Sequence, residues 1–231
     1  RIALNLIRLT GSSGNGIILG FTLATAFLSM WISNTATAIM MLPIAMSVVN
    51  LMKQEFLIHT TDESRFANFS TALMLSIAYA SSIGGMATLI GSPPNVVMAG
   101  LYRSQYQTDF SFLEWFAFGF PLSVLVLILC YFLLTRLLYP NRLSKVSGSE
   151  TLIRNKLASL GSWSLAEKRV LIIFSFTALM WIFRPLVNDA LVSLFIGESK
   201  PQDLIDDTSI AMLGGILMFI VPADRAAKQF I

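Results

Sequence analysis

The sequence has few of the residues on which catalysis, metal binding and disulfide bonding most often depend. Among 231 residues there is one histidine and one cysteine, and 13% of the residues are charged. Cys130 lies inside an apolar run and has no second cysteine to pair with, so no internal disulfide can hold the fold together. No group of His, Cys, Asp and Glu has the spacing of a zinc site, and we expect no structural transition metal.

Charge is also too sparse and too scattered to indicate a nucleic-acid partner. The net charge is +3, and the basic residues form no stripe with interleaved aromatic residues. What the chain has in abundance is apolar residues, which make up 55% of it and give a mean hydropathy of +0.71. This composition lies outside that of an ordinary soluble domain. It predicts an all-α integral membrane protein with the lipid bilayer as its main solvent.

Three apolar segments have the character of ordinary membrane spans. They are Phe112 to Thr135, Val170 to Val187 and the shorter Ile210 to Val221. A bilayer core of about 30 Å requires roughly 20 apolar residues of helix, and the first two segments, with 24 and 18 residues, are close to this length. Arg184 and Pro185 fall at the end of the second segment, where we expect the arginine side chain to extend to the membrane interface.

A longer apolar segment, Ile17 to Met52, is interrupted near its centre by the polar run Ser33-Asn34-Thr35. Its first arm, Ile17 to Met30, has 14 residues and would be about 21 Å long as a helix, too short to cross the bilayer core. The segment therefore predicts a re-entrant hairpin with its tip at the polar run. Backbone at such a tip is tolerated only where it is buried in protein or lines a wet cavity, so the tip indicates a site.

A second long segment, Phe69 to Tyr102, would form a helix of roughly 50 Å if it were continuous, which is more than the bilayer core accommodates. Gly84-Gly85 and the run Gly91 to Asn95, which contains two prolines, are the positions where we expect the helix to break. A proline lacks an amide donor and clashes with the preceding turn. The sequence therefore predicts a broken helix with an unwound stretch near the middle of the membrane.

The distribution of lysine and arginine predicts how the chain is oriented in the plasma membrane. The loop 136–169 is predicted to be cytoplasmic because of its seven basic residues, Arg136, Arg142, Lys145, Arg154, Lys156, Lys168 and Arg169. The loop that holds Lys53 and Arg65 is assigned to the same side, and the loop 103–111 to the outside. The acidic loop 188–207 is also predicted to be external.

The two interrupted segments have the chemistry of a transport site. Helix N-termini inside a membrane favour anions, whereas unwound carbonyls and Ser, Thr and Asn oxygens suit a hard cation such as sodium. Neither break contains Asp or Glu, so a bound anion would supply the negative charge that holds the cation. Such residues also occur in membrane helices merely as interhelical hydrogen-bonding groups. Together the two breaks favour cotransport of sodium with an anion and argue against a proton relay.

Two motifs resemble the signatures of a transporter family. The run Phe27 to Ala38, FLSMWISNTATA, followed by Met40 to Pro43, is similar to the first Ser-Asn-Thr signature of the divalent anion/sodium symporter family, the INDY-like dicarboxylate and citrate carriers. The run Gly84 to Asn95, GGMATLIGSPPN, resembles the next signature of that family. Weaker similarity continues through Trp181 to Pro185 and Ile210 to Pro222, so the resemblance covers most of the chain.

The resemblance implies which residues form the site. The substrate contacts that it implies are Ser33, Asn34, Thr35, Ser92 and Pro93. The sodium ligands that it implies are Ser29, Ser33, Asn34 and the carbonyl of Gly91. Ser33 and Asn34 would thus touch both the substrate and the coupling ion at the tip of an inward-opening hairpin.

The resemblance also implies an architecture and an activity. Members of the family have two inverted repeats, form homodimers, and move a substrate-binding domain like an elevator against a scaffold. Residues 1–111 would then belong to the transport domain, and residues 112–231 mostly to the scaffold, with the cytoplasmic loop 136–169. The expected function is symport of sodium with dicarboxylates such as succinate, malate or fumarate, or with related divalent anions.

Several alternatives remain open. A sodium-independent anion exchanger, or a sulfate, citrate or arsenite carrier, would have a similar architecture. An intramembrane hydrolase is disfavoured because no histidine, lysine or acid lies within either break to activate Ser33 or Ser92. A channel is also disfavoured, because channels usually have rings of charge or a carbonyl-rich filter and the sequence shows neither feature. The chain begins at Arg1 and has one copy of each signature, so we expect it to be part of a longer protein and not to transport by itself.

Overall fold

The structure is a computed structural model that describes residues 5, 9–11, 13–59, 63–108, 110–141, 143, 158–159, 161–195, 204–224 and 229–230. These residues are almost entirely helical, in agreement with the predicted all-α fold. The chain divides into two compact units. One comprises residues 1–110 and 114–161, and the other comprises residues 111–113 and 162–231.

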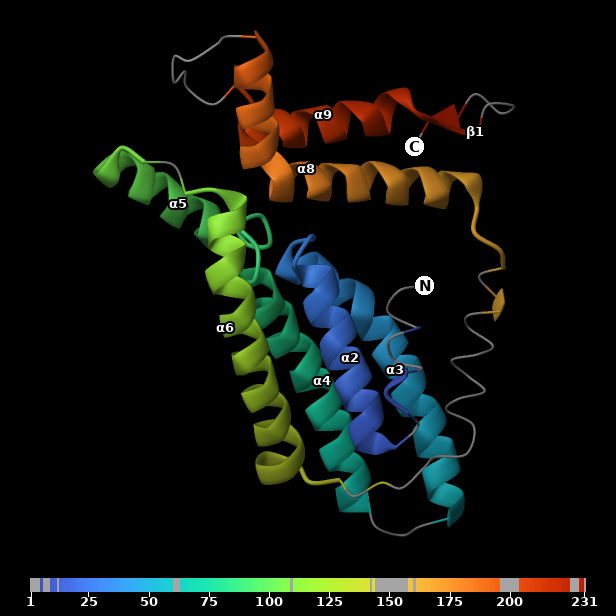
Figure 1. Cartoon of the computed structure of the whole chain (residues 1–231). Coiled ribbons are helices and arrows are strands. Elements are labelled where there is room, and N and C mark those ends of the chain that lie inside the picture. The colour runs from blue at the N-terminus through green and yellow to red at the C-terminus, as the bar shows by residue number, and fades with distance from the viewer. Residues whose placement is uncertain are drawn as a thin grey trace. The chain divides into compact units, whose positions relative to one another are not determined.

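The first unit is built around a helical hairpin. Helix α2 (Gly14–Ser29) begins at Ser13, whose hydroxyl accepts a hydrogen bond from the N–H of Gly16 at 3.1 Å. After the turn 30–33 the chain reverses into α3 (Asn34–His59), which runs antiparallel to α2 (Figure 1). The long apolar segment is thus interrupted near the predicted position, but only Ser33 of the polar run lies in the turn, because Asn34 and Thr35 already belong to α3. Whether this hairpin re-enters the membrane stays a prediction.

The second interrupted segment forms helix α4 (Glu63–Met86) and helix α5 (Pro93–Tyr106), with residues 87–92 unwound between them. The predicted break is thus confirmed, and Pro93 begins α5, where its missing N–H costs nothing. Gly84 and Gly85, however, lie inside α4 instead of interrupting it. Because α4 starts at Glu63, it is long enough to cross a bilayer alone, and the depth of the break in the membrane stays a prediction.

The core of the first unit lies between α2, α3 and α4. Its fully buried side chains include Ile17 and Phe21 of α2, Met41 of α3, and Phe69 and Leu73 of α4. Helix α6 (Phe112–Phe132) continues as the π-helical segment η1 (Leu133–Leu138) and contributes Tyr131 to the edge of this core. Close packing of α2 against both other helices fixes the position of the hairpin turn.

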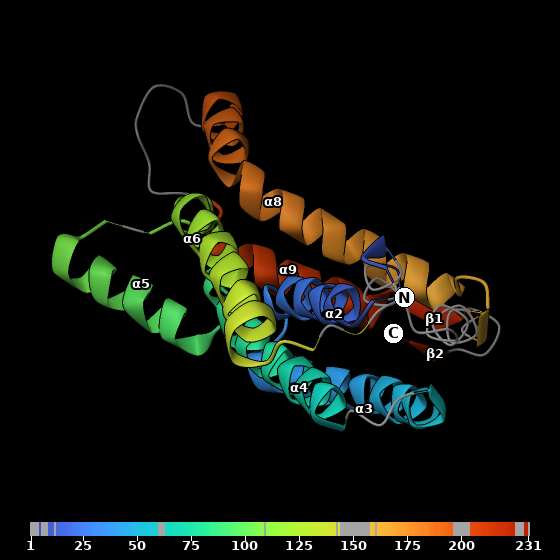
Figure 2. The same ribbon diagram turned by 90° about the horizontal axis from the view of Figure 1, so that it is seen from below.

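The second unit contains helix α8 (Leu165–Phe195), helix α9 (Asp207–Ile220), and a short antiparallel ribbon of β1 (Pro222–Asp224) and β2 (Gln229–Phe230). Reciprocal hydrogen bonds between Ser164 and Glu167 cap the start of α8. The prediction that this helix ends near Val187 is wrong. It continues past Pro185 for ten more residues and is visibly bent (Figures 1 and 2), as an internal proline would cause.

The expectation that Arg184 extends to the membrane interface is also wrong. Its side chain is buried, with 8% of the residue exposed, and its Nε lies 3.5 Å from Oδ1 of Asp207 at the start of α9. The other carboxylate oxygen of Asp207 accepts a hydrogen bond from the N–H of Phe112, and Trp181 Nε1 donates to the Asp207 carbonyl. A buried arginine is retained here because an acid pairs with it.

Three of the described helices are long and apolar enough to cross a membrane, namely Glu63–Met86, Phe112–Leu138 and Leu165–Leu194. These helices support an integral membrane protein. The segment Ile210 to Val221, expected to be an ordinary span, is instead the 14-residue helix α9, about 21 Å long and too short to cross the core. The predicted bounds of the basic loop 136–169 are wrong, because Arg136 lies in η1 and Lys168 and Arg169 lie in α8. The other basic residues of that loop, Arg142, Lys145, Arg154 and Lys156, lie outside the described part of the chain.

Adding a methyl group at Gly84 should destabilise the first unit. A Cβ atom at this position would lie 2.3 Å from the carbonyl oxygen of Ala26 in α2, which is backbone and cannot swing away. We expect Gly84→Ala to lower the free energy of unfolding by about 1–3 kcal/mol, measured as a lower thermal unfolding midpoint in detergent. The matched control is Gly100→Ala, where a Cβ meets nothing within 4 Å. Equal midpoints for the two variants would contradict the close approach of α2 and α4.

Acidification should weaken the start of α9. The hydroxyl and the N–H of Ser209 both donate to Asp206 Oδ1, at 2.6 and 2.7 Å, and these bonds lower the pKa of Asp206 below its usual value. A lowered pKa contributes stability above the unfolded value of about 3.9, and this contribution is lost as the pH falls through the folded value. We expect the thermal midpoint to fall less steeply below about pH 4 in Asp206→Asn, which keeps a capping oxygen but cannot titrate.

Candidate functional site

The tip of the α2–α3 hairpin and the break between α4 and α5 lie against each other. Ser29, the last residue of α2, has its hydroxyl oxygen 2.8 Å from Oδ1 of Asn34, the first residue of α3. The same hydroxyl lies 2.6 Å from the carbonyl oxygen of Ser81 in α4. The hydroxyl of Thr88, within the break, donates to the carbonyl of Met30 in the hairpin turn. Two motifs about fifty residues apart in sequence thus form one polar cluster.

The hydroxyl of Ser29 lies within hydrogen-bonding distance of two acceptors. Ser29 is fully buried, and its single hydroxyl hydrogen is shared between Asn34 Oδ1 and the Ser81 carbonyl. Side-chain and carbonyl oxygens gathered in this way suit a hard cation.

Gly84 and Gly85 make this arrangement possible. A Cβ atom at Gly85 would lie only 2.1 Å from Asn34 Oδ1, so any larger residue would displace that side chain. The role of the glycine pair is therefore close helix approach, and not the helix break that the sequence suggested. Gly91, an expected sodium ligand, also lies close to Gly85, because a Cβ at Gly91 would come within 2.6 Å of the Gly85 carbonyl oxygen. Gly91 and Asn34 are therefore both neighbours of Gly85.

The side chain of Asn95 holds the unwound stretch in shape. Its Nδ2 donates hydrogen bonds of 2.8 Å to the carbonyls of both Gly85 and Thr88, and the residue is buried. Helix α6 contacts the start of the unwound stretch, where Trp115 Nε1 donates a hydrogen bond of 3.0 Å to the carbonyl of Met86, the last residue of α4. The sequence motif contained Asn95 and Thr88, but without the fold neither could be given a role. An amide within a Gly-Pro-rich break was the signal for Asn95, since such a break leaves carbonyls to be satisfied.

The expected substrate residues are accessible to different degrees. Ser33 and Thr35 are exposed at the hairpin turn and at the start of α3, and Asn34 between them is half-buried. Ser92 is half-buried at the N-cap of α5, where its side chain makes no capping hydrogen bond, and Pro93 is exposed beside it. These residues thus lie at the N-termini of α3 and α5, which carry partial positive charge. Oxygens of the kind gathered around Ser29 suit a cation, and helix N-termini suit an anion.

Removing the Asn95 amide should disrupt the break. Asn95→Ala would remove the amide donor from the buried carbonyls of Gly85 and Thr88, and Thr88 would keep only the 3.3 Å hydrogen bond from the N–H of Gly91. We expect this loss to lower the free energy of unfolding by about 1–3 kcal/mol. We expect a markedly lower thermal midpoint than for Val96→Ala, an exposed neighbour on the same helix. If Asn95→Ala unfolds at the same temperature as this control, the amide does not stabilise the break.

Comparison with known proteins identifies the family of the chain and two of its relatives. Residues 1–223 match the family model described as the sodium:sulfate symporter transmembrane region. The chain is 35% identical over 229 residues to the sodium-dependent dicarboxylate transporter SdcS of Staphylococcus saprophyticus and 34% identical to that of Staphylococcus aureus. Each match covers 99% of this chain and 42% of the relative, so the chain spans about two fifths of their length. This chain belongs to the sodium:sulfate symporter family, a family of transporters and not of enzymes.

Proposed function

We propose that this chain forms the sodium-binding and anion-binding part of a transporter that couples sodium entry to the uptake of dicarboxylates such as succinate, malate or fumarate. The observation that carries the proposal is the cluster of oxygens around the buried Ser29 hydroxyl, which lies 2.8 Å from Asn34 Oδ1 and 2.6 Å from the Ser81 carbonyl oxygen. The sodium-dependent dicarboxylate transporters of the two Staphylococcus species, which share a third of its residues, support the same conclusion.

Sodium would bind among Ser29, Ser33, Asn34 and the carbonyl of Gly91. Two of these oxygens, Ser29 Oγ and Asn34 Oδ1, are already 2.8 Å apart. Sodium would lie beside the pair and bind both oxygens, while the Ser29 hydroxyl donates its hydrogen to the Ser81 carbonyl. Because the hairpin turn and the break contain no acid, the oxygens alone would bind sodium weakly.

The dicarboxylate would bind beside the ion, at Ser33, Asn34, Thr35, Ser92 and Pro93. A carboxylate there would face the N-termini of α3 and α5 and the hydroxyl of Ser92, which makes no capping hydrogen bond. It would also supply the negative charge that the sodium site lacks. Each ligand therefore improves the binding of the other, and this mutual dependence is the physical basis proposed for symport.

Transport itself would need the rest of the longer protein. We propose that residues 1–111 move with the substrate in an elevator-type step, that residues 112–231 contribute mostly to the scaffold, and that the complete protein is a homodimer. In the plasma membrane the basic loop 136–169 would face the cytoplasm and the hairpin tip would open inward. Helix α6 packs in the same compact unit as the hairpin, so its assignment to the scaffold is the first boundary to test.

A sulfate carrier is the second candidate, and the description of the matching family model, which names sodium and sulfate, favours it. Helix N-termini and hydroxyl groups bind a tetrahedral dianion as readily as a carboxylate. Citrate carriage and sodium-independent exchange would use the same architecture, and both are outcomes of the experiment below.

The test is uptake of radiolabelled succinate into liposomes that contain the complete protein, with and without an inward sodium gradient. We expect the gradient to be required. We expect Asn34→Ala to lower uptake at least about tenfold, because it removes an oxygen from both the ion and the substrate. The matched control is Asn50→Ala, an exposed asparagine on the same helix far from the tip, which should transport normally.

Each other result has a definite meaning. Uptake that does not depend on the sodium gradient would exclude symport and favour an exchanger. Sodium-dependent uptake of sulfate or citrate in place of succinate would support the proposed sodium site and replace the proposed substrate. Equal uptake by Asn34→Ala and Asn50→Ala would remove the hairpin tip from the mechanism.

A further inference from the structure

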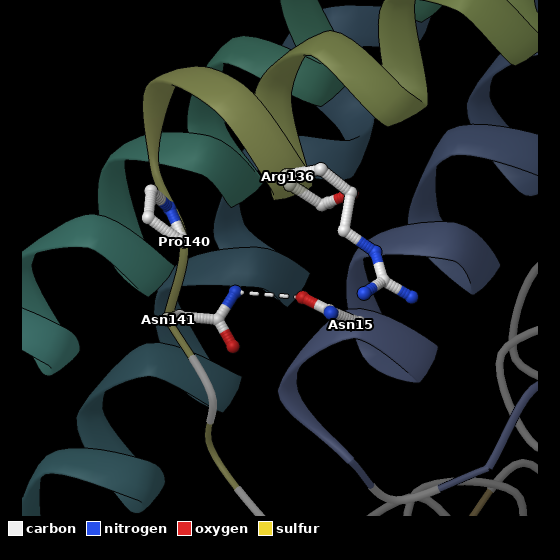
Figure 3. A pocket seen from close by; sticks show the side chains of 5 residues that line it. Asn15, Arg136, Pro140 and Asn141 are labelled. Atoms are coloured by element: carbon white, nitrogen blue, oxygen red, sulfur yellow. Dashed lines mark hydrogen bonds between the residues drawn. The ribbon is translucent and has the colours of Figure 1, made fainter.

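A cavity of about 140 Å³ lies at the end of α2 opposite the hairpin tip (Figure 3). It is large enough for several water molecules. Its lining comes from the first turn of α2, from η1 and from the segment that follows η1, and consists of Asn15, Thr135, Arg136, Pro140 and Asn141. All of these residues belong to the first compact unit.

Most polar groups of the lining are already paired. Asn141 Nδ2 donates to Asn15 Oδ1 at 2.8 Å, as Figure 3 shows, and Asn141 Oδ1 accepts from the N–H of Leu143. The hydroxyl of Thr135 donates to the carbonyl of Tyr131. Two donor groups are left over, the Nδ2 of Asn15 and the guanidinium of Arg136, which make no hydrogen bond or ion pair with another residue in the part of the chain that the structure describes.

The walls of the cavity are held in place from several sides. The Tyr131 hydroxyl donates to the carbonyl of Asn15 at 3.2 Å, and Asn68 of α4 donates to the carbonyl of Pro140 at 3.1 Å. Asn141 is 1% exposed, and a Cβ at Gly14 would come within 2.7 Å of its Oδ1. The two unused donors are therefore presented by a fixed frame and not by a mobile loop.

The charge of the lining selects an anion. Arg136 carries the one charge among the five lining residues, and the amide of Asn15 adds neutral donors in the first turn of α2, where the helix dipole is positive. A guanidinium with five N–H donors matches the oxygens of a phosphate group in geometry as well as charge.

The surroundings of Arg136 indicate where such a phosphate comes from. The arginine lies near the end of the apolar helix Phe112–Leu138, which is long enough to cross a membrane. Leu133 and Leu137, one turn before and one residue after it, are 47% and 72% exposed. An anion bound here would sit at headgroup level beside side chains suited to acyl chains. We propose that this cavity binds the phosphate group of an anionic phospholipid, through Arg136 and Asn15.

The experiment uses the complete protein in detergent, to which phosphatidylglycerol, phosphatidylcholine with the same acyl chains, or inorganic phosphate is added. Native mass spectrometry counts the retained lipids, and thermal unfolding reports stabilisation. We expect phosphatidylglycerol to be retained and to raise the thermal midpoint more than phosphatidylcholine does. Arg136→Gln should weaken its binding about tenfold or more, because a charge-assisted contact is lost.

Two further variants separate this site from general attraction between charges. Arg65→Gln removes the same charge from an exposed position on α4 outside the cavity, and it should bind the lipid as the wild type does. Asn15→Asp keeps an acceptor for Asn141 but places a negative charge beside Arg136, so it should weaken binding like Arg136→Gln.

Three results would overturn the proposal. Equal effects of Arg136→Gln and Arg65→Gln would mean that lipid binding does not involve the cavity. Equal retention of the two lipids would mean that the headgroup charge is not recognised. Stabilisation by inorganic phosphate alone, to the same extent as by phosphatidylglycerol, would mean that a free anion and not a lipid is the ligand.

Discussion

The approach of α4 to the hairpin turn is the contact on which the rest of the site depends. Two consecutive glycines bring the α4 backbone against Ala26 and Asn34, closer than any side chain would allow. This approach places the Ser81 carbonyl beside the Ser29 hydroxyl and Thr88 beside the turn. Without it, the hairpin and the break would be two separate polar defects in apolar helices, each with unsatisfied backbone groups.

The sequence was sufficient to predict the interruptions but not their packing. Proline lacks an N–H group wherever it occurs, so the break before Pro93 could be located without knowledge of the fold. The glycine pair was ambiguous, because the same residue that weakens a helix also allows close contact, and only the neighbour across the interface decides between these roles. Ser29 and Asn34 could be named together because the family resemblance implied both as sodium ligands. The contribution of Ser81 is a backbone carbonyl, which no residue type in the sequence could indicate.

Arg184 shows a second limit of reasoning from sequence. Its position at the end of an apolar run is typical of an arginine at the membrane interface. The same position is also compatible with a buried arginine whose acidic partner is distant in sequence. Asp207, twenty-three residues later, is that partner. Asn188 adds two hydrogen bonds to the backbone of Ile205, so the polar residues around the bend of α8 serve to attach the start of α9. Pro185 alone would have indicated an end to the helix, but tertiary contacts on both sides of it favour a bend.

The central parts of the hairpin and the broken helix carry no charge, and this has an electrical consequence. Residues 14–52 and 66–102 contain no Asp, Glu, Lys or Arg. Each elementary charge that crosses a membrane potential of 100 mV involves about 2.3 kcal/mol of work, and these residues would contribute none of it in a step that moved them. The charge displaced in that single step would therefore report the bound sodium and substrate, without a gating-charge contribution from these two ranges.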